Sequence, residues 1–203
     1  MADYARRKEL IQGISRKIKE CIDCPLHSTR TNTVPGEGSV EAPVIFVGEG
    51  PGADEDASGR PFVGKAGSLL TKILDSVGLS RDDVYITNIV KCRPPKNRVP
   101  TDNEQNTCAR YLMAQIAVIN PTVIVTLGAT ALSFFLRDNG MKMTEARGQL
   151  FDWKGNVKIF AMFHPSYLLR YPSREPGSPK SKTWEDIQKV RKMYDKLIQG
   201  EKI

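Results

Sequence analysis

The chain has 203 residues, which suits a single domain and is long enough to bury a substantial core. Hydrophobic residues make up 40% of it, and no apolar run approaches the roughly 18 residues of a membrane span, so no membrane partner is expected. The formal net charge of +7 favours a polyanionic partner such as nucleic acid, although a basic soluble enzyme would carry the same charge.

The amino terminus has no apolar segment of the kind found in secretory signals. A cytoplasmic protein is therefore expected, with residues 1–203 forming one domain that works as a monomer. In a reducing compartment the four cysteines are less suited to disulfides than to a metal or cluster site, provided that the fold brings them together.

Helical and strand-like segments alternate along the first half of the chain. Apolar residues at helical spacing predict a helix over 4–20, and an irregular segment rich in turn residues follows. The short apolar run 44–48 predicts a strand, from which a long loop leads to a helix over 65–78. A second strand is predicted over 84–90.

The second half continues this alternation. Three prolines exclude a helix over 92–100. Thr101 followed by Glu104 is a capping-box pattern, which predicts a helix from there to about residue 119. The remaining predicted segments are strands over 122–128 and 158–163, helices over 129–138 and 183–199, and a loop over 171–182.

Apolar strands that alternate with helices indicate a parallel sheet covered on both faces. The predicted fold class is α/β, with three α/β/α layers around a central, mainly parallel four-stranded sheet. In such sheets ligands bind beyond the carboxyl ends of the strands. Those ends carry Glu49, Asn88, Gly128 and His164. A carboxylate, an amide and an imidazole are therefore expected to converge on one edge of the sheet.

The segment EGPGADED at 49–56 resembles a phosphate-binding glycine loop at first reading. Its glycines fit the spacing of the dinucleotide-binding fingerprint, with Asp75 about 20 residues further on. However, the next helical pattern begins only near residue 65, and three successive acids in the loop would repel a pyrophosphate. No GK[ST] sequence follows. A phosphate cradle is therefore rejected.

The cysteines follow the pattern Cys21-x2-Cys24, a long interval, and then Cys92-x15-Cys108. A zinc ribbon would more often show two close pairs, and only one is present. Dispersed cysteines with prolines beside them suit a [4Fe–4S] cluster held by four thiolates. Two alternatives stay open: zinc, with His27 replacing one cysteine, and four buried cysteines without a metal.

Five segments of the chain are informative in combination with the cysteine spacing: GEGPGADED, GRPFVGKAG, NIVKCRPPKNR, LGATAL and FHPSYLLR. Together they resemble the family 4 uracil-DNA glycosylases, the iron–sulfur-containing members of the uracil-DNA glycosylase superfamily. The resemblance covers about residues 10–195. It implies an enzyme that flips deoxyuridine out of single- or double-stranded DNA and hydrolyses the N-glycosidic bond, which leaves an abasic site for base excision repair.

The resemblance also implies a role for each matched position. His164 would hydrogen-bond uracil O2 and stabilise the departing anion, helped by the backbone N–H of Gly50. Glu49 would act on the attacking water or on the sugar cation. Asn88 would donate to uracil O4 and accept from N3–H, which cytosine cannot match. Phe62 would stack on the flipped base.

Further positions carry lesser implications. Gly48 would line the base pocket, and Glu55 would crowd C5 and disfavour thymine. Leu168 or Leu169, in a loop, would wedge into the gap that the flipped base leaves. Phosphates would be contacted by Arg170, with Arg174, Lys180 and Lys182 beyond it.

Two competing functions remain at this point. One is an iron–sulfur protein for binding or electron transfer that also contacts nucleic acid, and the other is a nucleotide-binding module, which the acidic loop disfavours. A family 5 glycosylase would lack the Glu49 carboxylate, and the DNA-cross-linking relatives would carry a basic insertion that is absent between residues 64 and 70. The cluster is expected to scaffold the pocket rather than to perform redox chemistry.

Overall fold

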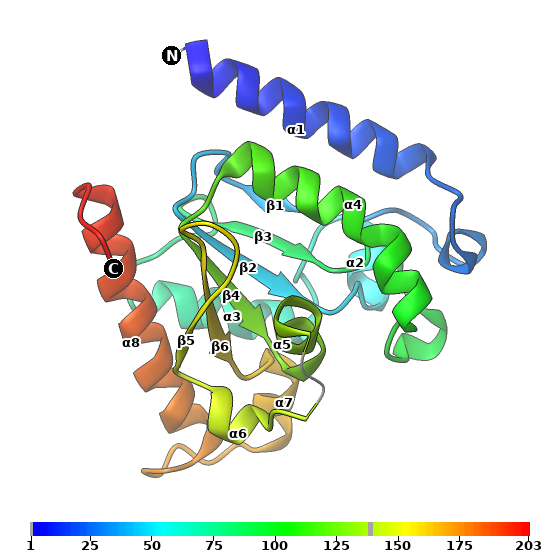
Figure 1. Ribbon diagram of the computed structural model, residues 1–203. Coiled ribbons are helices and arrows are strands. Elements are labelled where there is room, and N and C mark those ends of the chain that lie inside the picture. Colours follow the sequence, from blue (N-terminus) through cyan, green and yellow to red (C-terminus); the bar gives the residue numbers. More distant parts are fainter. Residues whose placement is uncertain (1, 138–139) are drawn as a thin grey trace.

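A computed structural model describes residues 2–137 and 140–203, and it shows helices on both faces of one mainly parallel sheet (Figure 1). The sheet has six strands in the order β1-β3-β2-β4-β6-β5. The four central strands pair in parallel: β3 (Tyr85–Asn88), β2 (Val44–Gly48), β4 (Val123–Leu127) and β6 (Lys158–Met162). The two edge strands, β1 (Glu37–Gly38) and β5 (Leu150–Asp152), pair antiparallel to their neighbours.

Side chains that alternate along the central strands divide the core into two halves. On β2, Ile45 and Val47 join one apolar cluster, whereas Val44 and Phe46 join the other. All five residues of this strand are buried. Both of its faces are covered by helices, which explains why its sequence shows no polar and apolar alternation.

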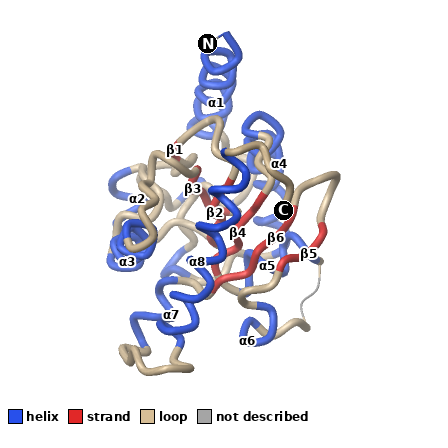
Figure 2. Tube along the Cα trace, turned by 90° about the vertical axis from the view of Figure 1, so that its left-hand side faces the viewer, coloured by secondary structure: helices blue, strands red, loops and turns tan. Residues whose placement is uncertain are grey.

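One helical layer contains α1 (Ala2–Glu20), α4 (Asp102–Ile119) and α5 (Ala129–Leu136), with α1 lying along α4 (Figure 1). The opposite layer contains α3 (Lys65–Asp75) and α8 (Pro179–Ile198), and Figure 2 looks onto α8 with the sheet behind it. The short elements are the helices α2 (Ala53–Ser58), α6 (Met143–Ala146) and α7 (Pro165–Arg170), and the 3₁₀ turns η1 (Pro25–Ser28) and η2 (Pro95–Asn97).

The predicted three-layer α/β fold is confirmed, but the predicted number of strands is wrong. The four predicted strands form the parallel centre, and the two additional edge strands have only two and three residues. Segments that short show no periodicity in a sequence. The five long predicted helices are also present, although residue 138, the predicted end of one, lies outside the described residues. The predicted loop 171–182 is wrong at its end, because Ser178 caps α8 and Pro179 opens it.

The helix α4 begins as its sequence predicts. The hydroxyl of Thr101 accepts a hydrogen bond from the backbone N–H of Glu104, and the Glu104 carboxylate accepts one from the backbone N–H of Thr101. This reciprocal capping box satisfies two backbone donors at the start of the helix.

The helix α2 begins at Ala53, directly after the glycines of the acidic loop. One argument against a phosphate cradle, that no helix begins before about residue 65, is therefore wrong. The rejection holds on its other ground. The first turn of α2 contains Asp54, Glu55 and Asp56, and Glu55 accepts a hydrogen bond from the backbone N–H of Gly52 at 3.0 Å. The carboxylate of the chain itself therefore occupies the place that a phosphate would need.

Across residues 2–137 and 140–203, no helix combines the length and the apolar character that a membrane span requires.

Candidate active site and cysteine cavity

A cavity of about 400 Å³ opens where the parallel strands end. Its lining includes Glu49 and Gly50 after β2, Asn88 at the end of β3, Gly128 after β4 and His164 after β6. The structure thus brings together the carboxylate, amide and imidazole that were predicted from strand ends. We call this cavity the base pocket.

Asn88 leaves an unpaired acceptor in the base pocket. It lies opposite Gly48 in the parallel register of β2 and β3, and it is 2% exposed. A Cβ atom at Gly48 would approach Asn88 Oδ1 and Phe62 Cζ to 2.5 Å each, so only glycine lets these side chains come so close. Among the described residues, Asn88 Oδ1 is the buried side-chain atom without a hydrogen-bond partner. Such an acceptor costs about 1–3 kcal/mol unless a ligand donates to it.

Phe62 forms an apolar wall of the pocket in a strained backbone conformation. Its φ angle is 52°, in the left-handed region that non-glycine residues seldom adopt, and its ring centroid lies 5.8 Å from that of His164. Gly67 allows this conformation, since a Cβ there would lie 1.9 Å from the Phe62 carbonyl carbon. Arg81 Nη1 donates to the Phe62 carbonyl oxygen at 3.0 Å. The surrounding contacts therefore hold the ring in place.

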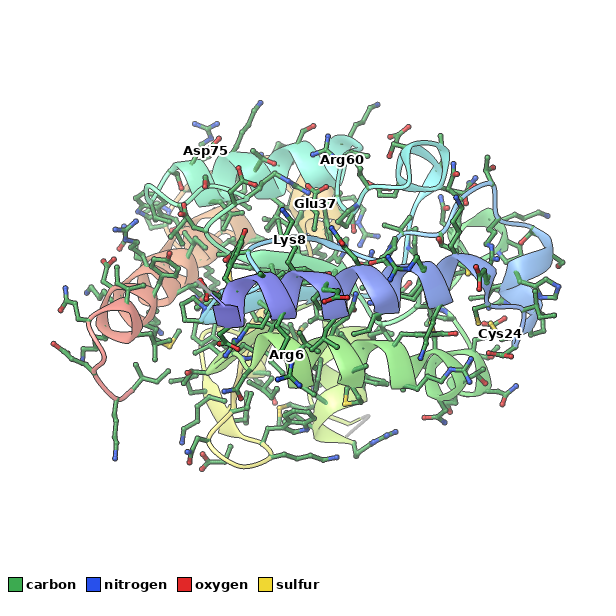
Figure 3. All side chains as sticks on the ribbon, turned by 90° about the horizontal axis from the view of Figure 1, so that it is seen from above. Arg6, Lys8, Cys24, Glu37, Arg60 and Asp75 are labelled. Carbon is green, nitrogen blue, oxygen red and sulfur yellow. The ribbon has the colours of Figure 1, made fainter. Side chains whose placement is uncertain are left out.

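A network of two arginines and one carboxylate holds the segment that carries Phe62. Arg81 donates to the Pro61 carbonyl at 2.6 Å and to Glu37 Oε1 at 2.8 Å, and Arg60 donates to Glu37 Oε2 at 2.8 Å. Figure 3 shows Glu37 beside Arg60. Partial burial would raise the pKa of Glu37, but the hydrogen bonds from both arginines outweigh it and lower the pKa. The edge strand β1, which carries Glu37, thereby fixes the pocket wall.

His164 is neutral and presents one N–H donor. It is the N-cap of α7, where its Nδ1 accepts from the backbone N–H of Ser166 at 3.1 Å. A backbone N–H can only donate, so the ring proton belongs on Nε2. Burial lowers the pKa of His164 to about 4, against the opposing charge of Glu55 and with a smaller contribution from Arg170. At neutral pH the ring therefore offers Nε2–H to the pocket without carrying a charge.

Glu49 is half-buried and is held from two directions. Its Oε2 accepts from Thr130 Oγ1 at 2.6 Å, and Thr130 lies in the first turn of α5. Its backbone carbonyl accepts from the N–H of Val90 at 3.2 Å, which continues the pairing of β2 with β3 beyond the strands. The carboxylate therefore has a fixed position in the pocket wall.

Glu55 also lines the pocket, but its carboxylate is already engaged. It accepts hydrogen bonds from the backbone N–H groups of Val63 at 2.8 Å, Gly64 at 2.9 Å and Gly52 at 3.0 Å. These bonds join the glycine loop to the Phe62 segment. Direct crowding of a base at C5 stays a prediction, whereas the joining of the two loops is seen.

The predicted DNA-wedging loop is a short helix, α7, and its two leucines differ. Leu168 is 1% exposed and is buried in the protein, so it could enter DNA only by leaving its packing. Leu169 is 46% exposed, and the neighbouring Arg170 is also exposed, with its guanidinium 5.7 Å from the Tyr167 ring centroid. The wedge prediction is therefore kept for Leu169 alone.

A second cavity collects all four cysteines. Cys21 and Cys24 follow the end of α1, Cys92 follows β3, and Cys108 lies on α4. In Figure 3, Cys24 lies beyond the carboxyl end of α1. All four are free. We call this space the cysteine cavity.

N–H donors point at the sulfur atoms of this cavity. Arg30 Nη1 lies 3.2 Å from Cys92 Sγ, and the backbone N–H of Lys91 lies 3.3 Å from Cys108 Sγ. Both contacts favour thiolates, but burial has the larger effect: it raises the pKa of Cys92, and it raises that of Cys108 to about 11. A bound metal would therefore have to displace the thiol protons.

The donor set of the cysteine cavity is of the kind that an iron–sulfur cluster binds. Within the part of the chain that the structure describes, no three His, Cys, Asp or Glu side chains are grouped closely enough to hold one metal ion. A tetrahedral zinc site would need sulfur atoms only about 3.8 Å apart. Four thiols around one cavity, with N–H donors to sulfur, are what a multi-iron cluster requires.

Lys91 connects the two cavities. It is 1% exposed, and its Nζ donates to Thr87 Oγ1 at 2.6 Å, the Asn88 carbonyl at 2.8 Å and Gln115 Oε1 at 2.8 Å. Burial lowers the pKa of Lys91 to about 7, with the charge of Cys108 opposing the shift. Lys91 thus contacts both sites: its side chain holds the backbone of Asn88, and its backbone N–H donates to the sulfur of Cys108.

Sequence comparison identifies the family. A sequence model of the uracil DNA glycosylase superfamily matches residues 35–188. The chain belongs to this superfamily. It is 52% identical over 190 residues to the type-4 uracil-DNA glycosylase of Thermotoga maritima, covering 94% of this chain and 97% of that protein.

Two further relatives are also named as uracil-DNA glycosylases. The type-4 uracil-DNA glycosylase of Archaeoglobus fulgidus is 46% identical over 170 residues, which cover 81% of this chain and 85% of that protein. The type-5 uracil-DNA glycosylase of Pyrobaculum aerophilum is 36% identical over 151 residues, covering 66% of each. The resemblance read from the sequence motifs is therefore confirmed.

Four residues that line or support the base pocket escape a reading of the sequence. Thr130, Arg81 and Lys91 hold Glu49, Phe62 and Asn88 respectively, as described above. The fourth, Arg98, lines the base pocket and donates to both oxygens of Glu104 at 2.7 Å. Hydrogen bonds from Arg98 lower the pKa of Glu104 to about 2. Only the capping box that contains Glu104 gave a local signal for any of these contacts.

Proposed function

We propose that this protein is a type-4 uracil-DNA glycosylase. It flips deoxyuridine out of DNA and hydrolyses its N-glycosidic bond, which releases uracil and leaves an abasic site at the start of base excision repair. The observation that carries the proposal is the buried, unpaired Oδ1 of Asn88, in a pocket that also presents a neutral imidazole and a carboxylate.

The base would be read by the amide of Asn88. Its Oδ1 accepts from uracil N3–H, and its Nδ2 donates to O4. Cytosine offers an acceptor at N3 and an amino donor at C4, so both contacts would be reversed. Each mismatched buried polar group costs about 1–3 kcal/mol. The ring of Phe62 would lie against the flat face of the base, where stacking contributes about 1–3 kcal/mol.

The departing base would be stabilised by His164. As the bond between C1′ and N1 breaks, its electron pair moves onto the base and negative charge builds on O2. The Nε2–H of the neutral imidazole donates to that oxygen, aided by the backbone N–H of Gly50. A site fixed by Ser166 and by the start of α7 needs no rearrangement to do this.

The sugar side would be served by Glu49. Its carboxylate stabilises positive charge at C1′ and orients the water whose oxygen forms the new bond to that carbon. The proton of this water passes to the Glu49 carboxylate and from there to solvent, and the uracil anion takes up a proton to leave as neutral uracil. Thr130 holds the carboxylate in place by its hydroxyl.

Cys21, Cys24, Cys92 and Cys108 would hold the [4Fe–4S] cluster. Their thiolates would tie the end of α1, the segment after β3 and α4 together around the cluster. Cys92 lies four residues after Asn88, so the anchored segment leads directly into the base pocket. The chain itself performs every step of the hydrolysis.

An assay with uracil-containing oligonucleotides tests the proposal. The protein is incubated with a labelled strand that carries one uracil, and alkali then breaks the strand at any abasic site. Strand breaks are expected with wild type, and none with a matched strand that carries thymine. Absence of breaks in the uracil strand, for protein that melts cooperatively and shows the visible absorbance of a cluster, would contradict the proposed function.

A further inference from the structure

A groove between α3, α7 and α8 carries positive charge and an exposed aromatic ring. It has a volume of about 420 Å³. Its cationic residues are Lys72 on α3, Arg174 in the loop after α7, and Lys180 at the start of α8. Trp184 lies on the same groove and is 47% exposed. We call it the basic groove.

The basic groove begins about one helical turn from the base pocket. On α3, Ala66 lines the pocket and Leu69 lines the groove, a separation of about 4.5 Å along the helix axis. On α7, Ser166 lines the pocket and Leu168 lines the groove. Two helices thus lead from one cavity to the other, and Figure 1 shows α7 near the amino-terminal end of α8.

The cations of the groove are not neutralised by the protein. No Asp or Glu is among its lining residues, and Lys72, Arg174 and Lys180 form no ion pair in the described part of the chain. The acids that follow Trp184 are Glu185 and Asp186, and both pair with Arg147 instead. The groove therefore offers its positive charge to a partner.

We propose that the basic groove binds the DNA strand that continues from the flipped nucleotide. Phosphates of that strand contact the three cations, and a base stacks on Trp184. This combination of a cationic track and an aromatic face binds single strands without regard to sequence. The proposal rests on the proposed function, because the flipped nucleotide fixes the point from which the strand enters the groove.

The first test compares short and long single-stranded oligonucleotides that each carry one uracil. The variant is Lys72→Gln/Arg174→Gln/Lys180→Gln. The control, Arg6→Gln/Lys8→Gln/Lys19→Gln, removes the same charge from exposed positions on α1, where Figure 3 labels Arg6 and Lys8. The α1 layer covers the opposite face of the sheet.

We expect the groove variant to raise KM for the long strand by a larger factor than for the short strand. The slope of log affinity against log salt for the long strand should fall by about 2, since each phosphate contact on a single strand contributes about 0.7. The control variant should match wild type in this slope. Equal slopes and KM values for the groove variant, the control and wild type would overturn the proposal.

The second test uses the fluorescence of Trp184. The chain has two tryptophans, and Trp153 packs edge-on against Phe135 at 5.2 Å on the other side of the sheet. Saturation with the long strand should quench the emission of wild type but not that of Trp184→Phe. Trp184→Ala should weaken binding of the long strand about fivefold, the lower end of the range for stacking.

The outcomes separate this proposal from the proposed function. If wild type releases uracil from neither strand, the proposed function fails. If it releases uracil from both, and binding of the long strand neither quenches Trp184 nor responds to the triple substitution, only the groove proposal fails. In that second case the groove would be a surface for another partner, such as an acidic protein segment.

Discussion

The segment from Asn88 to Cys92 connects the base pocket with the cysteine cavity. The two sites differ in whether their functional groups are ready to act before anything binds. In the base pocket the reactive atoms are already held: Asn88 Oδ1 is buried and unpaired, and His164 is neutral with its donor fixed. In the cysteine cavity, burial raises the pKa of Cys92 and of Cys108, so the thiols are protonated until a metal binds.

This difference predicts different consequences of substitution. A pocket whose atoms are set by the fold should lose reaction rate without losing stability when a reactive group changes. A cavity that is completed by a bound group should lose stability first, and rate only through the segments that it anchors. Lys91 donates hydrogen bonds to both sites, so its substitution should affect both the reaction rate and the stability.

The largest expected effect is that of Glu49→Gln on rate. The amide keeps the shape of the carboxylate and can still accept from Thr130, but it lacks the charge. The single-turnover rate of uracil release should fall by a factor on the order of 10²–10⁴, while the melting temperature stays at the wild-type value. A variant with an unchanged rate would remove Glu49 from the chemistry.

The next effect is on stability, in the cysteine cavity. Cys92→Ala removes one of the four thiols, and a loss of about 3 kcal/mol would lower the melting temperature by roughly 6–12 °C. The visible absorbance expected of a cluster should be lost as well. His27→Gln is the matched control, because His27 lines the same cavity without contributing a thiol. Full activity and unchanged melting of the Cys92 variant would contradict the scaffolding role, and a loss of metal in the His27 variant would favour zinc.

Asn88→Asp tests how the pocket reads the base. The substitution removes the donor to O4 and places a charge where the amide was buried. We expect kcat/KM for uracil to fall about 10- to 100-fold, as one or two buried polar contacts are lost, with little change in the visible absorbance. An unchanged kcat/KM would show that base recognition lies elsewhere.

These sites differ in how far the sequence predicts them. Glu49, Asn88 and His164 were placed correctly because each stands at the end of an apolar run, and the ends of parallel strands must meet. The helices α2 and α7 were missed because six residues are too few to show a helical period. Local signals for them exist in hindsight, since Glu55 accepts from the backbone N–H of Gly52 at the start of α2 and Pro165 occupies the first turn of α7.

The residues that support the site could not be predicted from the sequence, because their partners lie far along the chain. Thr130 is 81 residues from Glu49, and Arg81 is 44 residues from Glu37. No spacing rule links residues so distant, and each looks like an ordinary surface or helix residue in the sequence. Such contacts follow from the packing of the layers, which only the folded chain reveals.

The dependence of stability on pH tests whether His164 is held neutral in the base pocket. Its pKa is about 4 in the folded protein and about 6.5 in an unfolded chain, so the unfolded state binds the proton more readily. The stability that the neutral ring contributes is complete above about pH 6.5 and is lost as pH falls toward 4. The melting temperatures of wild type and His164→Gln should therefore converge over that interval. A nitrogen NMR titration should show Nε2–H below neutrality, and a midpoint near 6.5 would contradict the partly buried, capped ring.

The smallest expected effect, and the one that links the two regions, is that of Lys91→Met. The substitution keeps the unbranched apolar stem, one atom shorter, but leaves the Asn88 carbonyl and Gln115 Oε1 without their donor. We expect kcat/KM for uracil to fall about tenfold as Asn88 loosens. A general loss of stability could produce the same fall, so the single variant does not identify its cause.

A double-mutant cycle separates these causes. If Lys91 acts through Asn88, Lys91→Met should change kcat/KM little once Asn88→Asp is present, because the contact that it supports is already lost. Arg81→Met is the matched comparison, since Arg81 supports Phe62 on another wall of the pocket and its effect should add to that of Asn88→Asp. Additive effects of Lys91→Met and Asn88→Asp would mean that the cysteine cavity and the base pocket share a backbone segment but not a function.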